Sequence, residues 1–304
     1  MVDRPFFTIV TPTYNRPDKL ERAIKSVLKQ TFRDFEMVIV NDGSTVDYSY
    51  IETITNELGL KYFYRENNGR SAARNFGIEQ AKGQYICLLD DADAFIENHL
   101  EVLFNIIKQQ KYEIALFRTL AYGVLEEEVE SIEIPSLELS VKRKNDLFEI
   151  ENNKYINFLG AGAVAVHKEI FNKFKFNPKL VFWEDIDLWL RISPIYPFYK
   201  INQFTVKYIL HDNNTISWNE KNLKEKLKTL FYFKKHYKTE VPNDFINQNI
   251  YSVSLGIADI LSRDKDLSAF KYLRLAASNK PIKIFSRHFI GILKNFIAYQ
   301  HKKT

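Results

Sequence analysis

The sequence predicts an α/β fold built on a doubly wound, mostly parallel sheet, followed by an α-helical extension at the C-terminus. Three observations lead to this prediction. Short apolar runs of the kind that form buried strands alternate with amphipathic helical segments up to about residue 120. Several of these runs end in polar loops, and ligands bind beyond the carboxyl ends of the strands in such sheets. The last 85 residues carry helical patterns and a basic charge.

Strands and helices are expected to alternate in the first part of the chain. Residues 18–30 have Leu20, Ile24 and Val27 on one helical face, and Gly83 separates a helix from the strand that follows it. Such alternation is typical of parallel strands joined by right-handed crossovers. The predicted strands are 6–11, 35–40, 61–64 and 85–89, and the predicted helices are 18–30, 48–58, one ending near residue 81, and 98–109.

The middle of the chain is less regular. Residues 114–120, 159–166 and 198–210 read as strands, and a helix is expected to open at Glu184. The charged segment 126–146 is expected to be a mobile excursion or an edge hairpin. The predicted domains are an α/β domain over residues 1–217, which divides at about residue 120, and a basic helical region over residues 218–304.

Length and composition exclude several classes of protein. A chain of 304 residues corresponds to roughly two domains. Its single cysteine, Cys87, excludes an internal disulfide and fits a reducing compartment. The N-terminus lacks the apolar core of a signal peptide, and nowhere do eighteen apolar residues run together. We therefore expect a cytoplasmic protein, soluble or peripheral on the inner membrane face, and no nucleic-acid partner, since no DNA- or RNA-binding motif is present.

The basic charge belongs to the C-terminal region. Residues 220–304 hold 17 Lys and Arg against 7 Asp and Glu, a net +10, so the first 219 residues carry −5 of the total of +5. Helices are expected at 222–237, 245–261, 267–277 and 282–299. The last of these fits an interfacial helix on an anionic membrane. Packing in its own bundle and homo-oligomerisation are the alternatives.

Three carboxylates follow the most apolar predicted strand. Residues 85–89 run directly into Asp90, Asp91 and Asp93. These side chains can remain close together only if something positive neutralises them, and a hard divalent cation that also binds phosphate oxygens is the natural candidate. The alternative is an acidic cap for a helix starting near residue 96, which would use only one carboxylate.

Other polar residues follow the neighbouring strands. Tyr14 can stack on a base, Asp42 can accept from a base or a ribose hydroxyl, and Asn67 and Arg74 supply donors. Each has a structural alternative: partial core packing for Tyr14, turn chemistry for Asp42 and a surface ion pair for Arg74. Together, at consecutive strand ends, they favour a nucleotide pocket.

Two further positions carry candidate chemistry. Glu184 and Asp185 open a helix behind two aromatic residues, where the helix dipole alone favours carboxylates. A carboxylate against aromatic side chains can also have its pKa raised and act as a general base. His211 follows a predicted strand, and it is either structural or a group that completes a Mn²⁺ shell or binds a phosphate.

These segments resemble the inverting nucleotide-sugar glycosyltransferases of family 2, which have the GT-A fold. The resemblance covers about residues 6 to 215 and follows the family's order. It implies a glycosyltransferase domain over residues 1–217, with a nucleotide part (about 1–120) and an acceptor part (about 121–217). The matching segments are 8–16 (Thr-Ile-Val-Thr-Pro-Thr-Tyr-Asn-Arg), 35–44 (Phe-Glu-Met-Val-Ile-Val-Asn-Asp-Gly-Ser), Asn67 to Gly77 with Gly69, Arg74 and Asn75, Leu89-Asp90-Asp91-Ala92-Asp93, and Trp183-Glu184-Asp185.

The resemblance implies a GT-A enzyme that moves a sugar from a nucleotide diphosphate, such as UDP, to an acceptor hydroxyl in the synthesis of a surface polysaccharide or glycolipid. Asp185 would be the base, with Glu184 beside it, and Mn²⁺ or Mg²⁺ would bridge the diphosphate. The implied nucleotide-binding residues are Pro12, Tyr14, Asp42, Asn67, Arg74 and Asp91, and the implied metal-binding residues are Asp91, Asp93 and His211.

One position departs from the family pattern. Ala92 stands where the family's metal motif, Leu-Asp-x-Asp-Asp, has its middle aspartate. This leaves the main metal ligand open between Asp91 and Asp93, and we favour a slipped register because Asp91-Ala92-Asp93 restores the Asp-x-Asp spacing. The departure also makes credible a catalytically silent sugar-nucleotide-binding or scaffolding protein. A nucleotidyltransferase is disfavoured, because Pro12-Thr13-Tyr14-Asn15 is not a glycine- and lysine-rich phosphate loop.

Overall fold

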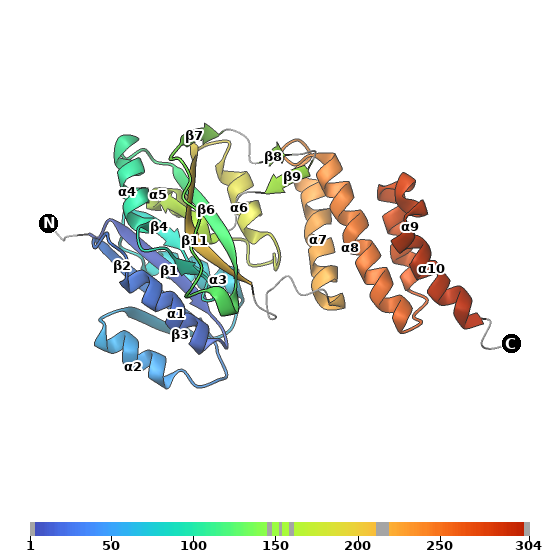
Figure 1. Ribbon diagram of the computed structural model, residues 1–304, viewed down its shortest axis with the longest axis horizontal. Coiled ribbons are helices and arrows are strands. Elements are labelled where there is room, and N and C mark those ends of the chain that lie inside the picture. The colour runs from blue at the N-terminus through green and yellow to red at the C-terminus, as the bar shows by residue number, and fades with distance from the viewer. Residues whose placement is uncertain (1–3, 145–147, 152–153, 158–160, 211–218, 301–304) are drawn as a thin grey trace. The chain divides into compact units, whose positions relative to one another are not determined.

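The structure is a computed structural model that describes residues 4–144, 148–151, 154–157, 161–210 and 219–300. The chain divides into two compact units, residues 1–211 and residues 212–304 (Figure 1). The first contains a large sheet with helices, and the second contains helices alone.

The first unit is built on a sheet with the strand order β3-β2-β1-β4-β10-β6-β11-β5. Strands β3, β2, β1 and β4 are parallel, as the alternation of strands and helices predicts. Their carboxyl ends therefore lie along one edge of the sheet. The elements of this part are β1 (Phe7–Thr13), α1 (Pro17–Leu28), β2 (Phe35–Asp42), α2 (Ser49–Glu57), β3 (Lys61–Arg65), α3 (Arg70–Gln80), β4 (Tyr85–Leu88), β5 (Ala94–Phe95) and α4 (His99–Gln109).

Helices cover both faces of this parallel part, so the sheet is doubly wound (Figure 1). Phe7 and Ile9 of β1 belong to the core that α1 and α4 cover. The alternate residue Val10 faces α3 on the opposite side. Strand residues alternate between the two faces, so an unbroken apolar run marks a strand buried on both sides.

Gly77 allows α3 to lie close against the sheet. A Cβ atom at this position would stand 2.5 Å from Cγ1 of Val10 and 3.1 Å from Cγ2 of Val40. We expect Gly77→Ala to lower the free energy of unfolding by about 1–3 kcal/mol, as overpacking does in tight cores, measured by urea denaturation. Gly123→Ala is the control, because nothing lies within 4 Å of a Cβ there. Equal midpoints for the two variants would contradict this account of the packing.

The rest of the sheet mixes strand directions. Strand β10 (Val164–His167) is antiparallel to both β4 and β6 (Leu116–Leu125), whereas β11 (Phe198–Leu210) runs parallel to β6. Both β6 and β11 agree with the predicted strands, and β6 is longer than expected. Part of the predicted excursion, β7 (Val141–Lys144), pairs with β11. The remaining elements are β8 (Phe148–Glu151), β9 (Lys154–Asn157), α5 (Lys168–Lys173) and α6 (Glu184–Ile192).

His99 lies inside the core at the start of α4. Its Nδ1 atom is 2.7 Å from Oγ1 of Thr205, and its ring stacks on Phe95 with centroids 3.9 Å apart. Within the described residues its Nε2 atom is buried without a hydrogen-bond partner. Burial lowers the pKa of His99 to about 3, because the charged imidazolium would be desolvated.

This histidine makes the folded state sensitive to acid. Its folded pKa lies below the usual value of about 6.5, so its contribution is present above pH 6.5 and is lost as the pH falls toward 3. We expect the free energy of unfolding to lose about 1.4 kcal/mol per pH unit in that range from this group alone. Urea denaturation at pH 7 and pH 5 should give a smaller pH dependence for His99→Asn. The same slope in both proteins would exclude His99 as the source.

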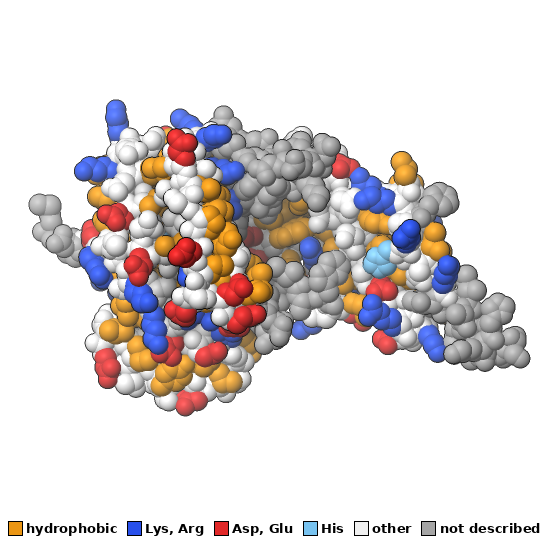
Figure 2. All heavy atoms as spheres, viewed as in Figure 1, with side chains coloured by type: hydrophobic (Ala, Val, Ile, Leu, Met, Phe, Trp, Pro, Cys, Tyr) orange, Lys and Arg blue, Asp and Glu red, His pale blue; other side chains and the backbone are white. Residues whose placement is uncertain are grey.

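The second unit consists of α7 (Glu220–His236), α8 (Asn243–Arg263), α9 (Ala269–Asn279) and α10 (Arg287–Gln300). Their apolar faces pack together, with Leu230, Phe233, Ile250, Ile257 and Leu273 buried. This agrees with the predicted helical extension. Basic and apolar side chains are intermixed on the face of these helices that Figure 2 shows. Within the described residues no helix is long and apolar enough to cross a membrane.

Candidate active site

The predicted nucleotide-binding residues lie along the carboxyl edge of four adjacent strands. Pro12 is buried in β1, and Tyr14, just beyond that strand, is 43% exposed. Asp42 is the last residue of β2, and Asn67 lies in the loop between β3 and α3. Because the strand order is β3-β2-β1-β4, the topology brings these residues to one edge together with the three aspartates after β4.

Asp42 organises the loop that precedes α3. Its carboxylate oxygens accept hydrogen bonds from the backbone N–H of Gly69 at 2.8 Å and of Asn68 at 3.2 Å. The side chain of Asn67 donates to the Asp42 carbonyl at 2.8 Å. Gly43 lets the two loops meet, since a Cβ there would stand 2.5 Å from the Asn67 nitrogen. These contacts give Asp42 a structural role, and its role toward a nucleotide remains a prediction.

We call Asp90, Asp91 and Asp93 the acid cluster. Asp91 is held by the loop after β1, since it accepts from Oγ1 of Thr13 at 3.0 Å and lies 3.4 Å from Nη1 of Arg16. Asp93 accepts from the backbone N–H of Ile209 at 3.1 Å. The following helix, α4, begins only at His99, with Asn98 in the cap position. The acid cluster is therefore not the cap of that helix.

Burial makes two of these carboxylates difficult to ionise. The pKa of Asp91 is raised to about 6, chiefly by burial and further by Asp90, while Arg16 and Thr13 oppose the shift. The pKa of Asp93 is raised well above its usual range, chiefly by burial and then by Asp90. A divalent cation would compensate both negative charges, so this donor set of hard oxygen atoms fits Mn²⁺ or Mg²⁺.

The described residues supply only part of a coordination shell. No group of three or more His, Cys, Asp or Glu side chains among them is arranged to hold a metal. The predicted third ligand, His211, lies outside the described residues.

Arg74 joins the acid cluster to the predicted base. Its Nη2 atom lies 2.6 Å from Oδ1 of Asp90, and its Nη1 atom lies 2.7 Å from Oε1 of Glu184. The guanidinium also lies 5.3 Å from the centre of the Phe176 ring. Burial alone would raise the pKa of Asp90, but the positive charges of Arg74 and Arg70 outweigh it and lower that pKa. Arg74 is 1% exposed and is not the surface ion pair considered as its alternative.

The predicted base lies in a tightly held turn at the start of α6. Trp183 has a left-handed backbone conformation (φ 56°), and Glu184 is buried behind it. Asp185 is half-buried and accepts from the N–H of Ile186 at 2.8 Å. Its pKa is raised to about 7 by burial and by the neighbouring Glu184, whereas Arg74 and Arg70 oppose the shift. Such a carboxylate can accept a proton near neutral pH.

Several residues that hold this site together were assigned no role from the sequence. Arg70 lies 2.9 Å from Oε1 of Glu184, and Asn75 makes two hydrogen bonds of 2.9 Å with the backbone of Phe176. Thr13 and Arg16 support Asp91. The spacing of Arg70 and Arg74 was the available signal, because residues four apart lie on the same helical face.

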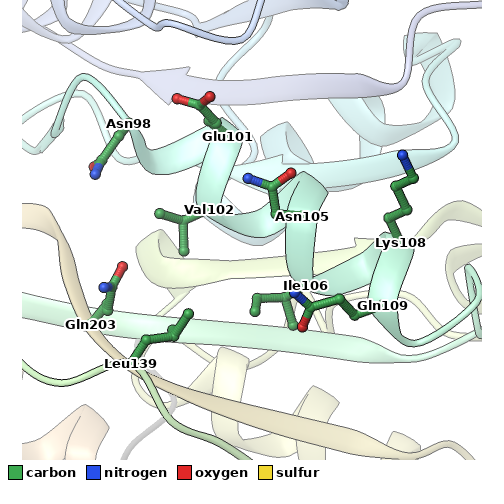
Figure 3. Close-up of a pocket in the computed structure, with 9 residues that line it drawn as sticks. All are labelled: Asn98, Glu101, Val102, Asn105, Ile106, Lys108, Gln109, Leu139 and Gln203. Carbon is green, nitrogen blue, oxygen red and sulfur yellow. The ribbon is translucent and has the colours of Figure 1, made fainter.

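A pocket of about 510 Å³ lies elsewhere on this unit (Figure 3). It is lined by one face of α4 together with Leu139 and Gln203, and none of the predicted site residues borders it. The candidate site is therefore defined by the strand edge and the acid cluster.

Comparison with known proteins gives matches to glycosyltransferases. The model of Glycosyl transferase family 2 matches residues 8–173. An uncharacterized glycosyltransferase of Methanocaldococcus jannaschii is 29% identical over 259 residues, which is 82% of this chain and 84% of that protein. One from Rickettsia bellii is 35% identical over 127 residues, which is 41% of this chain but only 18% of that longer protein.

Two solved structures share the fold. TarS 1-349 of S. aureus in complex with UDP-GlcNAc has a TM-score of 0.53 and 18% identity, covering 96% of this chain and 80% of that one. The mannosyltransferase PcManGT of Pyrobaculum calidifontis, in complex with GDP-Man and Mn²⁺, has a TM-score of 0.58 and 12% identity, covering 98% and 87%. At these identities the likeness establishes the GT-A fold.

Proposed function

This chain belongs to glycosyl transferase family 2, and from that premise we propose that it transfers a sugar from a nucleotide diphosphate to an acceptor hydroxyl with inversion at the anomeric carbon. The observation that carries the proposal is the contact of one buried guanidinium with both Asp90 and Glu184. Arg74 thus links the acid cluster, which is proposed to face the phosphates, to Glu184, the neighbour of the carboxylate Asp185 that would take the proton.

The chemistry follows from this pairing. The nucleotide would lie along the carboxyl edge, contacted by Pro12, Tyr14, Asp42, Asn67 and Arg74. Asp185 would accept the proton of the acceptor hydroxyl while the oxygen of that hydroxyl forms a bond to the anomeric carbon. The bond from that carbon to the diphosphate breaks on the opposite face, and the diphosphate leaves with the electron pair. This direct displacement needs no covalent nucleophile and inverts the configuration.

Asp91 and Asp93 are proposed to hold Mn²⁺ or Mg²⁺, with His211 as a further ligand. When bound, the cation would offset the charge that develops on the departing diphosphate. The residues of the chain then have separate tasks: Arg16 and Thr13 fix Asp91, and the N–H of Ile209 fixes Asp93.

UDP is the proposed nucleotide, and TarS is known in complexes with UDP and UDP-GlcNAc. We propose a saccharide or lipid-linked acceptor in surface-polysaccharide or glycolipid synthesis. The net charge of +10 in residues 220–304 supports a cytoplasmic location with peripheral contact to the anionic inner face of a membrane. Phe270, Lys271 and Arg274 form an exposed apolar and basic stripe on α9 that fits such a surface. A homo-oligomer formed through these helices is the alternative.

The first test is a titration of UDP by calorimetry with and without Mn²⁺, followed by an assay of slow hydrolysis of UDP-sugars. We expect Mn²⁺ to tighten UDP binding and to permit hydrolysis that Asp185→Asn abolishes. Parallel titrations with GDP determine which nucleobase, uracil or guanine, the site prefers. No binding of either nucleotide in the presence of Mn²⁺ would overturn the proposal.

A catalytically silent sugar-nucleotide-binding or scaffolding protein is the second candidate. It is favoured by Ala92, which replaces a carboxylate of the family's metal motif, and by the partial coordination shell among the described residues. This candidate predicts that the protein binds UDP without hydrolysing the donor, and that Asp185→Asn does not change UDP binding.

A further inference from the structure

Arg70, the first residue of α3, contacts the turn that carries the proposed base. Its Nε atom lies 2.9 Å from Oε1 of Glu184, and its Nη2 atom donates to the carbonyl oxygen of Val181 at 2.9 Å. One planar side chain therefore binds two points on the turn, on either side of Trp183. The rigid fork of a guanidinium suits such two-point binding, which a lysine ammonium cannot reproduce.

The turn needs this support because Trp183 is in a strained conformation. Its φ of 56° lies in the left-handed region, which is unfavourable for a side chain of this size. Such a conformation persists only where the surroundings enforce it. Arg70 and Arg74 both bind Oε1 of Glu184 from α3. The position of Asp185, the next residue, thus depends on these contacts.

We propose that Arg70 is a positioning residue for the base Asp185, which it holds in place through Val181 and Glu184 and whose negative charge it balances. The inference rests on the proposed function, since it assigns Asp185 the role of base. Arg70 lies between the loop that Asp42 organises and the turn at α6. It therefore connects the donor side of the site to the acceptor side.

The charged groups around Asp185 make the idea testable by pH. Glu184 on its own helix raises the pKa of Asp185 after the larger effect of burial, and Arg74 and Arg70 from α3 lower it. Removal of the Arg70 charge should therefore raise the pKa of Asp185 further. Removal of the Glu184 charge should lower it. If Arg70 supported the turn by packing alone, removal of its charge would leave the pKa of Asp185 unchanged.

The experiment compares Arg70→Met, Arg70→Lys, Glu184→Gln and wild type by sugar transfer or donor hydrolysis across pH 5–9. For Arg70→Met we expect kcat to fall by about 10–100-fold, since a small misplacement of a reacting group has effects of this size. The donor KM should stay within about twofold. The acid limb of the pH–rate profile, where the rate falls as Asp185 becomes protonated, should move up by about one pH unit. This is the lower end of the pKa shift that one neighbouring charge produces. In Arg70→Lys the limb should stay near that of wild type while kcat remains low.

Arg33→Met is the matched control, because Arg33 is an exposed arginine that also donates to a backbone carbonyl, that of Leu28, at 2.9 Å. It should leave kcat and the acid limb unchanged. Thermal melting confirms that each variant is folded. If Arg70→Met does not fold, a reduced kcat in Arg70→Lys together with a lowered limb in Glu184→Gln supports the proposal, and wild-type values in both overturn it.

The outcomes separate this proposal from the proposed function. If the wild type transfers sugar and Arg70→Met keeps its kcat and acid limb, the positioning role is wrong and the function stands. If the wild type transfers no sugar, titration of the Asp185 carboxyl carbon by ¹³C NMR still tests whether Arg70 acts on Asp185. A pKa raised in Arg70→Met supports the contact, and an unchanged pKa overturns it.

Discussion

Asp185→Asn is expected to lower kcat for sugar transfer by about 10²–10⁴-fold, the usual contribution of a general base. An amide cannot accept the proton of the acceptor hydroxyl. Nucleotide binding should be retained, since Asp185 is predicted to act on the acceptor side. Because the pKa of Asp185 is raised to about 7, the wild-type rate should increase as the pH rises through about 7 and the carboxylate ionises. Initial rates across pH 5–9 measure both effects.

Asp18→Asn provides the control for this substitution. Asp18 is an exposed carboxylate in the first turn of α1, as Asp185 is in the first turn of α6, so both variants remove one charge from a helix N-terminus. Asp18→Asn should leave the rate and the pH profile unchanged. A rate for Asp185→Asn within threefold of wild type would remove Asp185 from the reaction and favour another base.

Arg74→Met is expected to lower the free energy of unfolding by about 3–5 kcal/mol, the usual result when one partner of a buried ion pair is removed. Arg74 and Glu184 are buried, and Asp90 would also lose its partner. Methionine keeps much of the side-chain volume, so the loss measures charge compensation more than packing. Urea denaturation at pH 7.5 gives the value.

The double variant Arg74→Met with Glu184→Gln is the informative comparison. It removes the buried negative charge that Arg74→Met leaves with Arg70 as its remaining partner, so it should recover part of the lost stability, with a coupling of about 0.5–3 kcal/mol. Additive losses would mean that Arg74 acts through its contact with Phe176 or with Asp90 alone.

Much of the first half of the fold could be predicted because local signals and tertiary structure agree there. Buried parallel strands need unbroken apolar runs, and the helices between them need one apolar face. The predicted helix at 98–109 and α4 (His99–Gln109) differ by one residue. Strand β5 was not predicted, because two residues carry no periodicity. Its existence depends on pairing with distant β11.

The site was predictable as a set of residues but not as a network. Strand topology brings Asp42, Asn67 and the acid cluster to one edge, and the residue order along the chain contains that information. The contacts of Arg74 with Asp90 and Glu184 span 16 and 110 residues, and no local pattern indicates which carboxylates a buried arginine will meet. The support from Arg70 was missed for the same reason.

Strand β10 has a consequence for how substrates enter and leave. It is hydrogen-bonded to β4 on one side and β6 on the other, so the predicted nucleotide and acceptor parts share one uninterrupted sheet across the described residues. Bending between these parts would break backbone hydrogen bonds along a whole strand. We therefore expect any opening and closing around the proposed donor to be confined to the loops at the sheet edge, and the rate of product release to follow loop motion rather than a hinge between lobes.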